Sequence, residues 1–232
     1  IAAAGLSTSS LGTSNFRAGV NAGNSIEAGG NYNTVVGDEA GTAITTGDNN
    51  VGIGSNSLAL NTTGTQNTAV GAFALDSNTT ADDNTAVGGS ALGQNTTGAS
   101  NTALGRSALT ANTTGASNTA VGKDALVANT TGNINTAVGL SALAANTEGL
   151  NNSALGVNAL NANTTGDDNV AIGYQALLLN TTADDNTAVG NAALKLNTTG
   201  HSNTAVGKAA GGAITTGDYN VAVGMNALDA NT

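Results

Sequence analysis

Polar and apolar residues recur along this chain with a period of seventeen residues. Asn occupies the first position of each repeat, from Asn33 to Asn220, and Gly always occupies the fifth position. The consensus is NTAVGxxALxxNTTGxx, where x marks variable positions. Eleven full copies cover residues 33–219, a partial twelfth covers 220–232, and a degenerate eighteen-residue copy covers 15–32. The chain is therefore expected to repeat one structural unit along its length.

The pattern within one repeat favours short β-strands and turns. Two glycines, β-branched residues and fixed asparagines are unfavourable in a helix. Thr-Ala-Val suits a strand, Gly permits a corner, Ala-Leu suggests a second extended stretch, and Asn-Thr-Thr-Gly suggests a turn. We therefore expect an all-β fold, a parallel β-solenoid or β-roll with 17-residue coils spaced by about 4.8 Å.

This register divides the chain and assigns an inside and an outside. Residues 1–32 form a degenerate leading segment with the first coil, and residues 33–232 form eleven full coils and a partial twelfth. Val at position 4 and Leu at position 9 are expected inside the coil. Ala at position 3 is expected to point away from Val, on a face small enough to pack against another chain. Structural ladders are expected at these stacked residues: Asn84, Asn101, Asn118, Asn135, Gly88, Gly105, Gly122 and Gly139.

A second periodicity overlies the first. The segment AGTAITTGDNNVGIG at residues 40–54 returns as AGGAITTGDYNVAVG at residues 210–224, ten repeats later. In both segments Gly replaces the core Leu and Ile replaces the second Asn. The Ile side chain is expected to fill the space that the missing Leu leaves. The longer unit also suggests a piece of a larger array.

Composition and charge exclude several classes of function. The chain has 39% hydrophobic residues but only 2% aromatic residues, so the core must be thin and built from Ala, Val and Leu. Its net charge of −10 disfavours nucleic acid and anionic membrane surfaces as partners. No apolar run approaches the ~20 residues of a membrane-spanning helix. The absence of Cys leaves the compartment open.

Candidate chemistry is sparse. His201 lies at a variable position and is expected to be exposed, and no Ser-His-Asp arrangement or phosphate-binding Gly-rich loop occurs. Seventeen of the twenty charged residues lie at positions 6, 7, 10, 16 and 17, which are expected to face water. The aromatic residues Phe73, Tyr174 and Tyr219 occupy such positions and are expected to be exposed, where they contact a glycan or a neighbouring chain if they form a patch. We expect no enzyme activity and no cofactor.

Paired aspartates are the most plausible metal site. Asp167 and Asp168 are expected to stack on Asp184 and Asp185, and carboxylate oxygens suit Ca²⁺ or Mg²⁺. The spacing matches no EF-hand, so a divalent cation site and a solvated acidic turn both remain open.

Runs of NTAVG..AL..NTTG over residues 15–232 resemble the repeats of marine bacteriophage tail-fibre-like proteins. More loosely, they resemble the shorter repeats in the head domain of trimeric autotransporter adhesins, whose Ala-Ile-Gly core is similar to Ala171-Ile172-Gly173. The resemblance implies a left-handed β-roll, a homotrimer and a location outside the cell, at the cell surface or in a virion tail fibre.

Three functions are therefore considered. The leading hypothesis is a structural shaft segment that acts as a rigid spacer for attachment. The first alternative is an adhesion module whose side binds a host-surface glycan or protein. The second alternative is an ice-binding solenoid that uses the Thr at position 13, although adjacent threonines in a strand would point apart.

Overall fold

The computed structural model describes residues 6–7 and 12–229, with side chains for residues 12–229. In this part of the chain the protein is all-β, and it is a parallel β-solenoid with seventeen-residue coils, which confirms the predicted fold class. The chain divides into two units, residues 1–117 and 118–232. The handedness of the coils stays a prediction.

Each coil contributes one short strand. The first unit contains β1 (Leu6–Ser7), β2 (Phe16–Ala18), β3 (Thr34–Val36), β4 (Val51–Ile53), β5 (Thr68–Val70), β6 (Thr85–Val87) and β7 (Thr102–Leu104). The second unit contains β8 (Thr119–Val121), β9 (Thr136–Val138), β10 (Ser153–Leu155), β11 (Val170–Ile172), β12 (Thr187–Val189), β13 (Thr204–Val206) and β14 (Val221–Val223).

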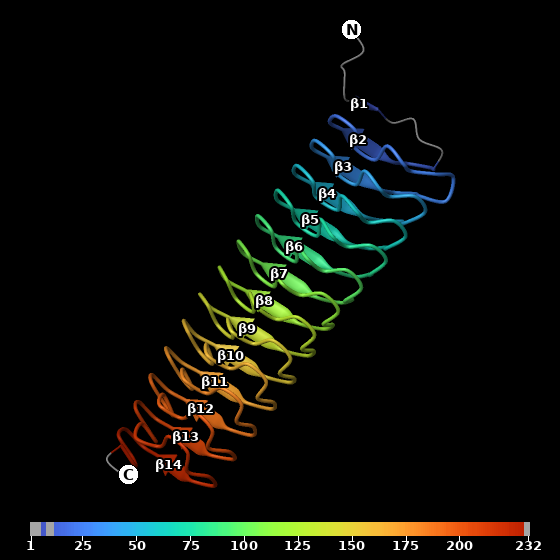
Figure 1. The fold of residues 1–232 in the computed structure, drawn as a ribbon. Helices are drawn as coiled ribbons and strands as arrows, with labels where there is room; N and C mark the ends of the chain where they lie inside the picture. The colour runs from blue at the N-terminus through green and yellow to red at the C-terminus, as the bar shows by residue number, and fades with distance from the viewer. Residues whose placement is uncertain (1–5, 8–11, 230–232) are drawn as a thin grey trace. The chain divides into compact units, whose positions relative to one another are not determined.

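Within each unit the strands follow one another in chain order, as Figure 1 shows. β1 pairs antiparallel with β2, and all other pairs are parallel. Residues seventeen apart are paired, for example Thr68 with Thr85, whereas the first coil pairs Phe16 with Thr34, eighteen residues later. The sequence repeat is therefore the structural repeat.

The inside of the coil differs from the prediction at two positions. Leu126 at position 9 is fully buried, as predicted, but Ala120 at position 3 is also fully buried. Val121 at position 4 is partly exposed. The prediction that position 4 faces inward and position 3 outward is therefore wrong. Alternate residues of a strand share a face, and Ala at position 3 shares its face with the buried Asn at position 1.

The Ala-Leu segment is a turn, so the predicted second extended stretch is also wrong. The core leucines at position 9 have φ between 46° and 54°, in the left-handed region. This conformation turns the chain back over the strand and directs the side chain into the coil. A Leu on one side leaves room for only a small residue on the other, which explains Ala at positions 3 and 8.

The stacked asparagines satisfy buried polar groups in two ways. At position 1, the Oδ1 of Asn84 accepts the backbone N–H of Asn101 at 2.9 Å, and the Oδ1 of Asn118 accepts that of Asn135 at 2.9 Å. Their Nδ2 groups donate to the carbonyl of position 15 in the same coil, as Asn118 does to Gly132 at 2.8 Å. Position 1 therefore links side chain to backbone, and some coils add an amide-to-amide bond, as Asn169 does by donating to the Oδ1 of Asn152 at 3.1 Å.

Position 12 forms the amide-to-amide ladder. In the first unit Asn78 donates to the Oδ1 of Asn61 at 2.8 Å, and in the second unit Asn163 donates to that of Asn146 at 2.9 Å. Because these groups are fully buried, removing one partner leaves an unpaired polar atom at a cost of about 1–3 kcal/mol.

Within each unit the glycines at position 5 form a column in which no side chain fits. Gly88, Gly105, Gly122 and Gly139 have φ of 135°, 139°, 134° and 137°. A Cβ added at Gly88 would lie 2.6 Å from the carbonyl carbon and oxygen of Gly105, and one at Gly139 would lie 2.5 Å from the carbonyl oxygen of Gly156. Both the backbone conformation and the close stacking require Gly here.

Three coils replace Leu by Gly and Asn by Ile, because the first coil has Gly23 and Ile26 at these positions, and the packing agrees with the expected compensation. The Cδ1 of Ile44 lies 2.8 Å from the position that a Cβ on Gly41 would take. In the second unit the Cδ1 of Ile214 lies 3.3 Å from the corresponding position on Gly211. The Ile side chain therefore occupies the space of the missing Leu.

Candidate functional site

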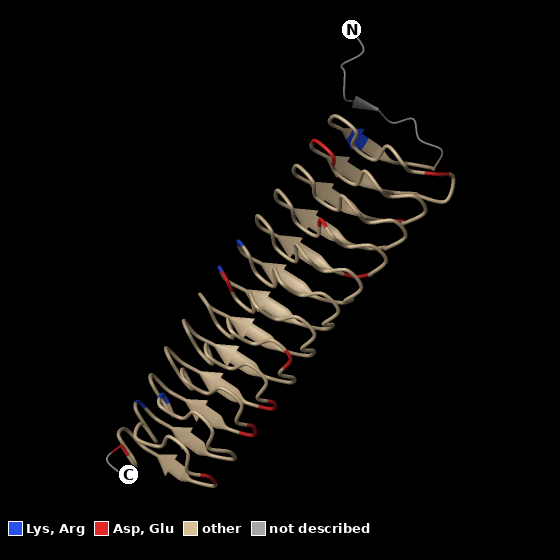
Figure 2. Ribbon diagram, in the orientation of Figure 1, with Lys and Arg blue, Asp and Glu red and all other residues tan. Residues whose placement is uncertain are grey.

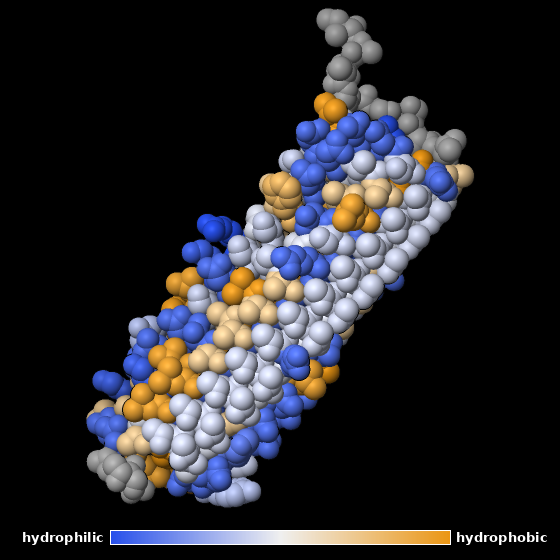
Figure 3. Space-filling model, in the orientation of Figure 1, coloured by the Kyte–Doolittle hydropathy of each residue, from blue (hydrophilic) through white to orange (hydrophobic). Residues whose placement is uncertain are grey.

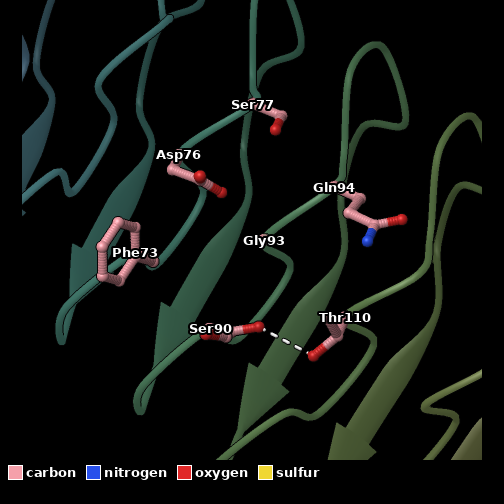
Figure 4. Close-up of a pocket in the computed structure, with 7 residues that line it drawn as sticks. All are labelled: Phe73, Asp76, Ser77, Ser90, Gly93, Gln94 and Thr110. Atoms are coloured by element: carbon pink, nitrogen blue, oxygen red, sulfur yellow. Dashed lines mark hydrogen bonds between the residues drawn. The ribbon is translucent and has the colours of Figure 1, made fainter.

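A hollow of about 230 Å³ opens at the surface of the first unit. It is lined by Phe73, Asp76, Ser77, Ser90, Gly93, Gln94 and Thr110, which belong to three successive coils (Figure 4). The lining residues come from position 7, two residues before the core Leu, and from positions 10 and 11, directly after it.

The hollow exists because Gly93 carries no side chain. Asp76 and Thr110 occupy the same position in the coils on either side. The Oγ1 of Thr110 donates to the carbonyl oxygen of Ser90 at 2.8 Å, drawn as the dashed line in Figure 4, and this bond fixes one wall. The space is therefore bounded by Asp76 on one side and Thr110 on the other.

The Asp76 carboxyl is the titratable group of the hollow. Partial burial raises the pKa of Asp76 above its usual value, while hydrogen bonds from the backbone N–H groups of Asp76 and Ser77 act in the opposite direction. Beside it, the Phe73 side chain is 48% exposed. The hollow is thus lined by one carboxyl, one amide from Gln94, the residues Ser77, Ser90 and Thr110, and Phe73.

Sequence reasoning missed most of this site. Phe73 was expected to be exposed, and it is, together with Tyr174 and Tyr219. Asp76, Gly93 and Gln94 were not singled out. The available signal was Gly at position 10, where the neighbouring coils carry a side chain, but Gly is too frequent in this chain to mark a site by itself.

The paired aspartates are brought together, but two of them bind backbone. The Oδ1 of Asp167 accepts the N–H of Leu150 at 2.6 Å, and the Oδ1 of Asp184 accepts the N–H of Asp167 at 2.8 Å. Asp168 and Asp185 are exposed, with φ of 56° and 60°. Within residues 12–229, no group of three or more His, Cys, Asp or Glu is arranged to hold a metal ion. A cation here stays a prediction.

His201 belongs to the same column. Its Nδ1 accepts the backbone N–H of Asp184 at 3.0 Å, and its own N–H donates to the Oδ1 of Asp218 at 2.7 Å. Its side chain is partly exposed, and it takes the place that Asp occupies in neighbouring coils. Figure 2 shows the acidic residues of this column on the turns, away from strands β3 to β14. We interpret position 16 as a backbone-capping position.

The outward face of the strands carries two parallel ranks. Position 2 is mostly Thr and position 4 is always Val, Leu or Ile. The position-4 side chains are substantially exposed, for example Leu155 at 50% and Val206 at 39%. No charged residue occupies either rank in β3 to β14.

Thr residues form further ranks on the turn that follows position 12. The Thr at position 13 donates its hydroxyl to the carbonyl of the same position in the next coil, as Thr164 does to Thr181 at 3.0 Å. The Thr at position 14 is exposed, and Figure 3 shows near-white columns, the colour of threonine on its scale, on the visible face. The position-13 hydroxyls therefore have a structural use.

The described part of the chain contains no helix long and apolar enough to cross a membrane. Comparisons with models of protein families, with curated proteins and with solved structures find no match. The fold thus defines the class of the protein, which is a β-solenoid repeat protein.

Proposed function

We propose that this chain is a shaft segment of an extracellular or virion fibre, which acts as a rigid spacer for attachment. The observation that carries the proposal is that successive coils repeat the same inter-coil bonds. One coil of the second unit contributes the bonds Asn152 N–H to Asn135, Thr147 to Thr164 and Asn163 to Asn146. The resemblance to tail-fibre-like and adhesin repeats supports the same proposal.

A spacer needs stiffness and adjustable length, and this architecture supplies both. Each coil contacts its neighbours through buried asparagine bonds, strand pairing and a glycine column, so bending must break several bonds together. Each coil adds about 4.8 Å because that is the spacing of paired strands. The mechanism requires no turnover and no cofactor.

Small-angle scattering of a length series tests this proposal. Duplicating residues 152–168 once, twice and four times should raise the maximum dimension by about 4.8 Å per added coil. Duplicating residues 152–160 alone, as a control, should disrupt the stack because the added segment is not a whole coil. A maximum dimension that does not grow linearly with whole coils contradicts the spacer.

As part of this proposal, the chain assembles as a homotrimer. The alanines at position 3 are interior, so they cannot form the interface. The uncharged, aliphatic position-4 rank is the alternative because burying it removes apolar surface from water. Light scattering should give three times the 22.1 kDa chain mass, and Val189→Asp with Val206→Asp should weaken assembly. Thr182→Asp with Thr199→Asp is the control, and a monomer at micromolar concentration contradicts the trimer.

Ice binding is the second candidate, and the outward strand face favours it. Thr-x-aliphatic pairs such as Thr187-Val189 and Thr204-Val206 lie on one face and alternate with the buried alanines. This face replaces the position-13 rank as the candidate surface. Ice recrystallisation inhibition should be lost in Thr187→Lys with Thr204→Lys and kept in Thr182→Lys with Thr199→Lys. Absence of inhibition by the unmodified chain rules this function out.

A further inference from the structure

The hollow at Gly93 brings residues from three successive coils around one space. Here an aromatic residue, a carboxyl and an amide, those of Phe73, Asp76 and Gln94, line one space together with serine and threonine hydroxyls (Figure 4). Binding sites combine an apolar surface with a few convergent polar groups. None of these side chains contributes to the Asn or Gly stacking that holds the coils together.

Three features restrict what the hollow can bind. Its volume of about 230 Å³ is suited to one six-membered ring with its substituents. The net charge of −10 and the Asp76 carboxyl oppose an anionic ligand. One carboxyl without a second acidic group nearby is a poor ligand set for a divalent cation, which takes six or more oxygen ligands.

The chemistry that remains is that of a neutral polyhydroxylated ring. The Asp76 carboxylate accepts two hydrogen bonds, and the Gln94 amide both donates and accepts, which suits adjacent hydroxyl groups. The exposed Phe73 ring offers an apolar face beside them. Burial of Asp76, which raises the pKa of its carboxyl, also means that part of its hydration is already lost before a ligand arrives.

We propose that the hollow formed by Phe73, Asp76, Gly93 and Gln94 binds one neutral pyranose residue of a surface glycan. The Phe73 ring packs against the carbon face of the sugar, and Asp76 and Gln94 bond its hydroxyls. Because the site is open and holds a single ring, the dissociation constant is expected on the order of 1 mM. This goes beyond the spacer function and does not depend on it.

Filling the hollow gives the sharpest variant. A Cβ at Gly93 would lie 3.3 Å from the carbonyl oxygen of Ser90 and 3.4 Å from the Oδ1 of Asp76, so it fits with a slight shift. The next coil carries Thr110 at the same position, so the backbone there accepts a β-branched residue. Gly93→Thr should therefore fold normally and occupy the ligand volume. Ala59→Thr, at the same position of an earlier coil, is the matched control.

The experiment is an NMR titration of the full ¹⁵N-labelled chain. The probes are the methyl glycosides of glucose, galactose and N-acetylglucosamine, with sialic acid and tetramethylammonium as charged comparisons. At least one neutral glycoside should shift the amides around Gly93 saturably. Gly93→Thr and Phe73→Ala should weaken that binding at least tenfold, and Ala59→Thr should leave it within twofold. Thermal melts of each variant should stay close to that of the unmodified chain.

The alternatives are distinguishable. Saturable binding of tetramethylammonium without any glycoside would assign the site to a cation and overturn the proposal. So would glycoside binding that Gly93→Thr leaves intact, or no saturable shift up to about 50 mM, fifty times the expected dissociation constant. If Gly93→Thr destabilises the fold, Phe73→Ala and Gln94→Ala, both at the surface, decide the result. A failed titration leaves the length series of the spacer unaffected.

Discussion

Coils with Leu and Asn in their interior can be compared with coils that carry Gly and Ile at the same positions. In residues 152–168 the interior contains Leu160 and Asn163, and the Asn continues the amide ladder. In residues 203–219 it contains Gly211 and Ile214, and the ladder ends. Leu with Asn and Gly with Ile therefore fill the same interior volume, but only the Leu–Asn coil also forms an amide hydrogen bond with its neighbouring coil.

The end of the ladder leaves a visible defect. The Oδ1 of Asn197 is buried and has no hydrogen-bond partner, because the next coil presents Ile214 where another Asn would donate. Coil interiors are therefore interchangeable in volume but not in polar bonding. This difference can be tested by exchanging interior residues.

The largest effect is expected from a charge inside a Leu–Asn coil. Leu126→Asp places an unpaired carboxylate in a fully buried position and should destabilise the protein by about 4 kcal/mol or more. Lys123→Asp, on the exposed turn of the same coil, should cost less than about 1 kcal/mol. Chemical denaturation measures both, and equal losses would show that the register is wrong.

Exchanging the interior of the Gly–Ile coil tests the compensation directly. Gly211→Leu alone conflicts with the Cδ1 of Ile214 at 3.3 Å and with the Cδ2 of Leu194 at 2.9 Å, the movable end of a flexible side chain. Ile214→Asn alone leaves a cavity, so each change should cost about 1–3 kcal/mol. The double variant should recover most of that loss, because the new amide can donate to the Oδ1 of Asn197.

The matching exchange in residues 33–49 is the control. There the Cγ1 of Val35 lies 2.6 Å from the position of a Cβ on Gly41, so Gly41→Leu with Ile44→Asn should not recover. The measurement is a double-mutant cycle in urea. If the free-energy losses of the two single variants simply add in the double variant of both coils, the proposed compensation between Gly and Ile is contradicted.

A smaller effect separates the two faces of a strand. Ala188→Val overfills the interior and should cost about 1–3 kcal/mol. Val189→Ala, on the outward face, should change the unfolding free energy of the isolated chain by no more than about 0.5 kcal/mol. If thermal melts show that Val189→Ala destabilises the protein more than Ala188→Val does, the arrangement in which Val faces inward would be supported instead.

The smallest effect concerns the Asp76 carboxyl. Its folded-state pKa is raised, so the protonated form is favoured in the folded protein and ionisation costs stability as pH rises. Asp76→Asn should therefore be slightly more stable than the unmodified chain at pH 7. The difference should vanish below the unfolded-state value of 3.8. A pH series of melting temperatures checks this, and a difference that grows at low pH contradicts it.

The sequence was sufficient for the period, the strand, the turn and the core Leu, because these repeat in every coil. It was insufficient to assign the inward and outward faces of Thr-Ala-Val, because the larger side chain of Val suggested that Val was the interior residue. The buried Asn two positions before Ala contains the missing information, since residues i and i+2 share a face. The hollow depends on one absent side chain and on neighbours seventeen residues away, which no local pattern specifies.

The central claim is that each seventeen-residue repeat is one interchangeable coil, and thermal unfolding of two deletions tests it most directly. Deleting residues 152–168 joins Asn151 to Asn169 and keeps every column in register. It should leave a cooperative melt within a few degrees of the original, because stability is roughly a sum over coils. Deleting only residues 152–160 shifts all later side chains and should lower the melting temperature far more, with loss of β-sheet circular dichroism. Equal losses from the two deletions would contradict the account.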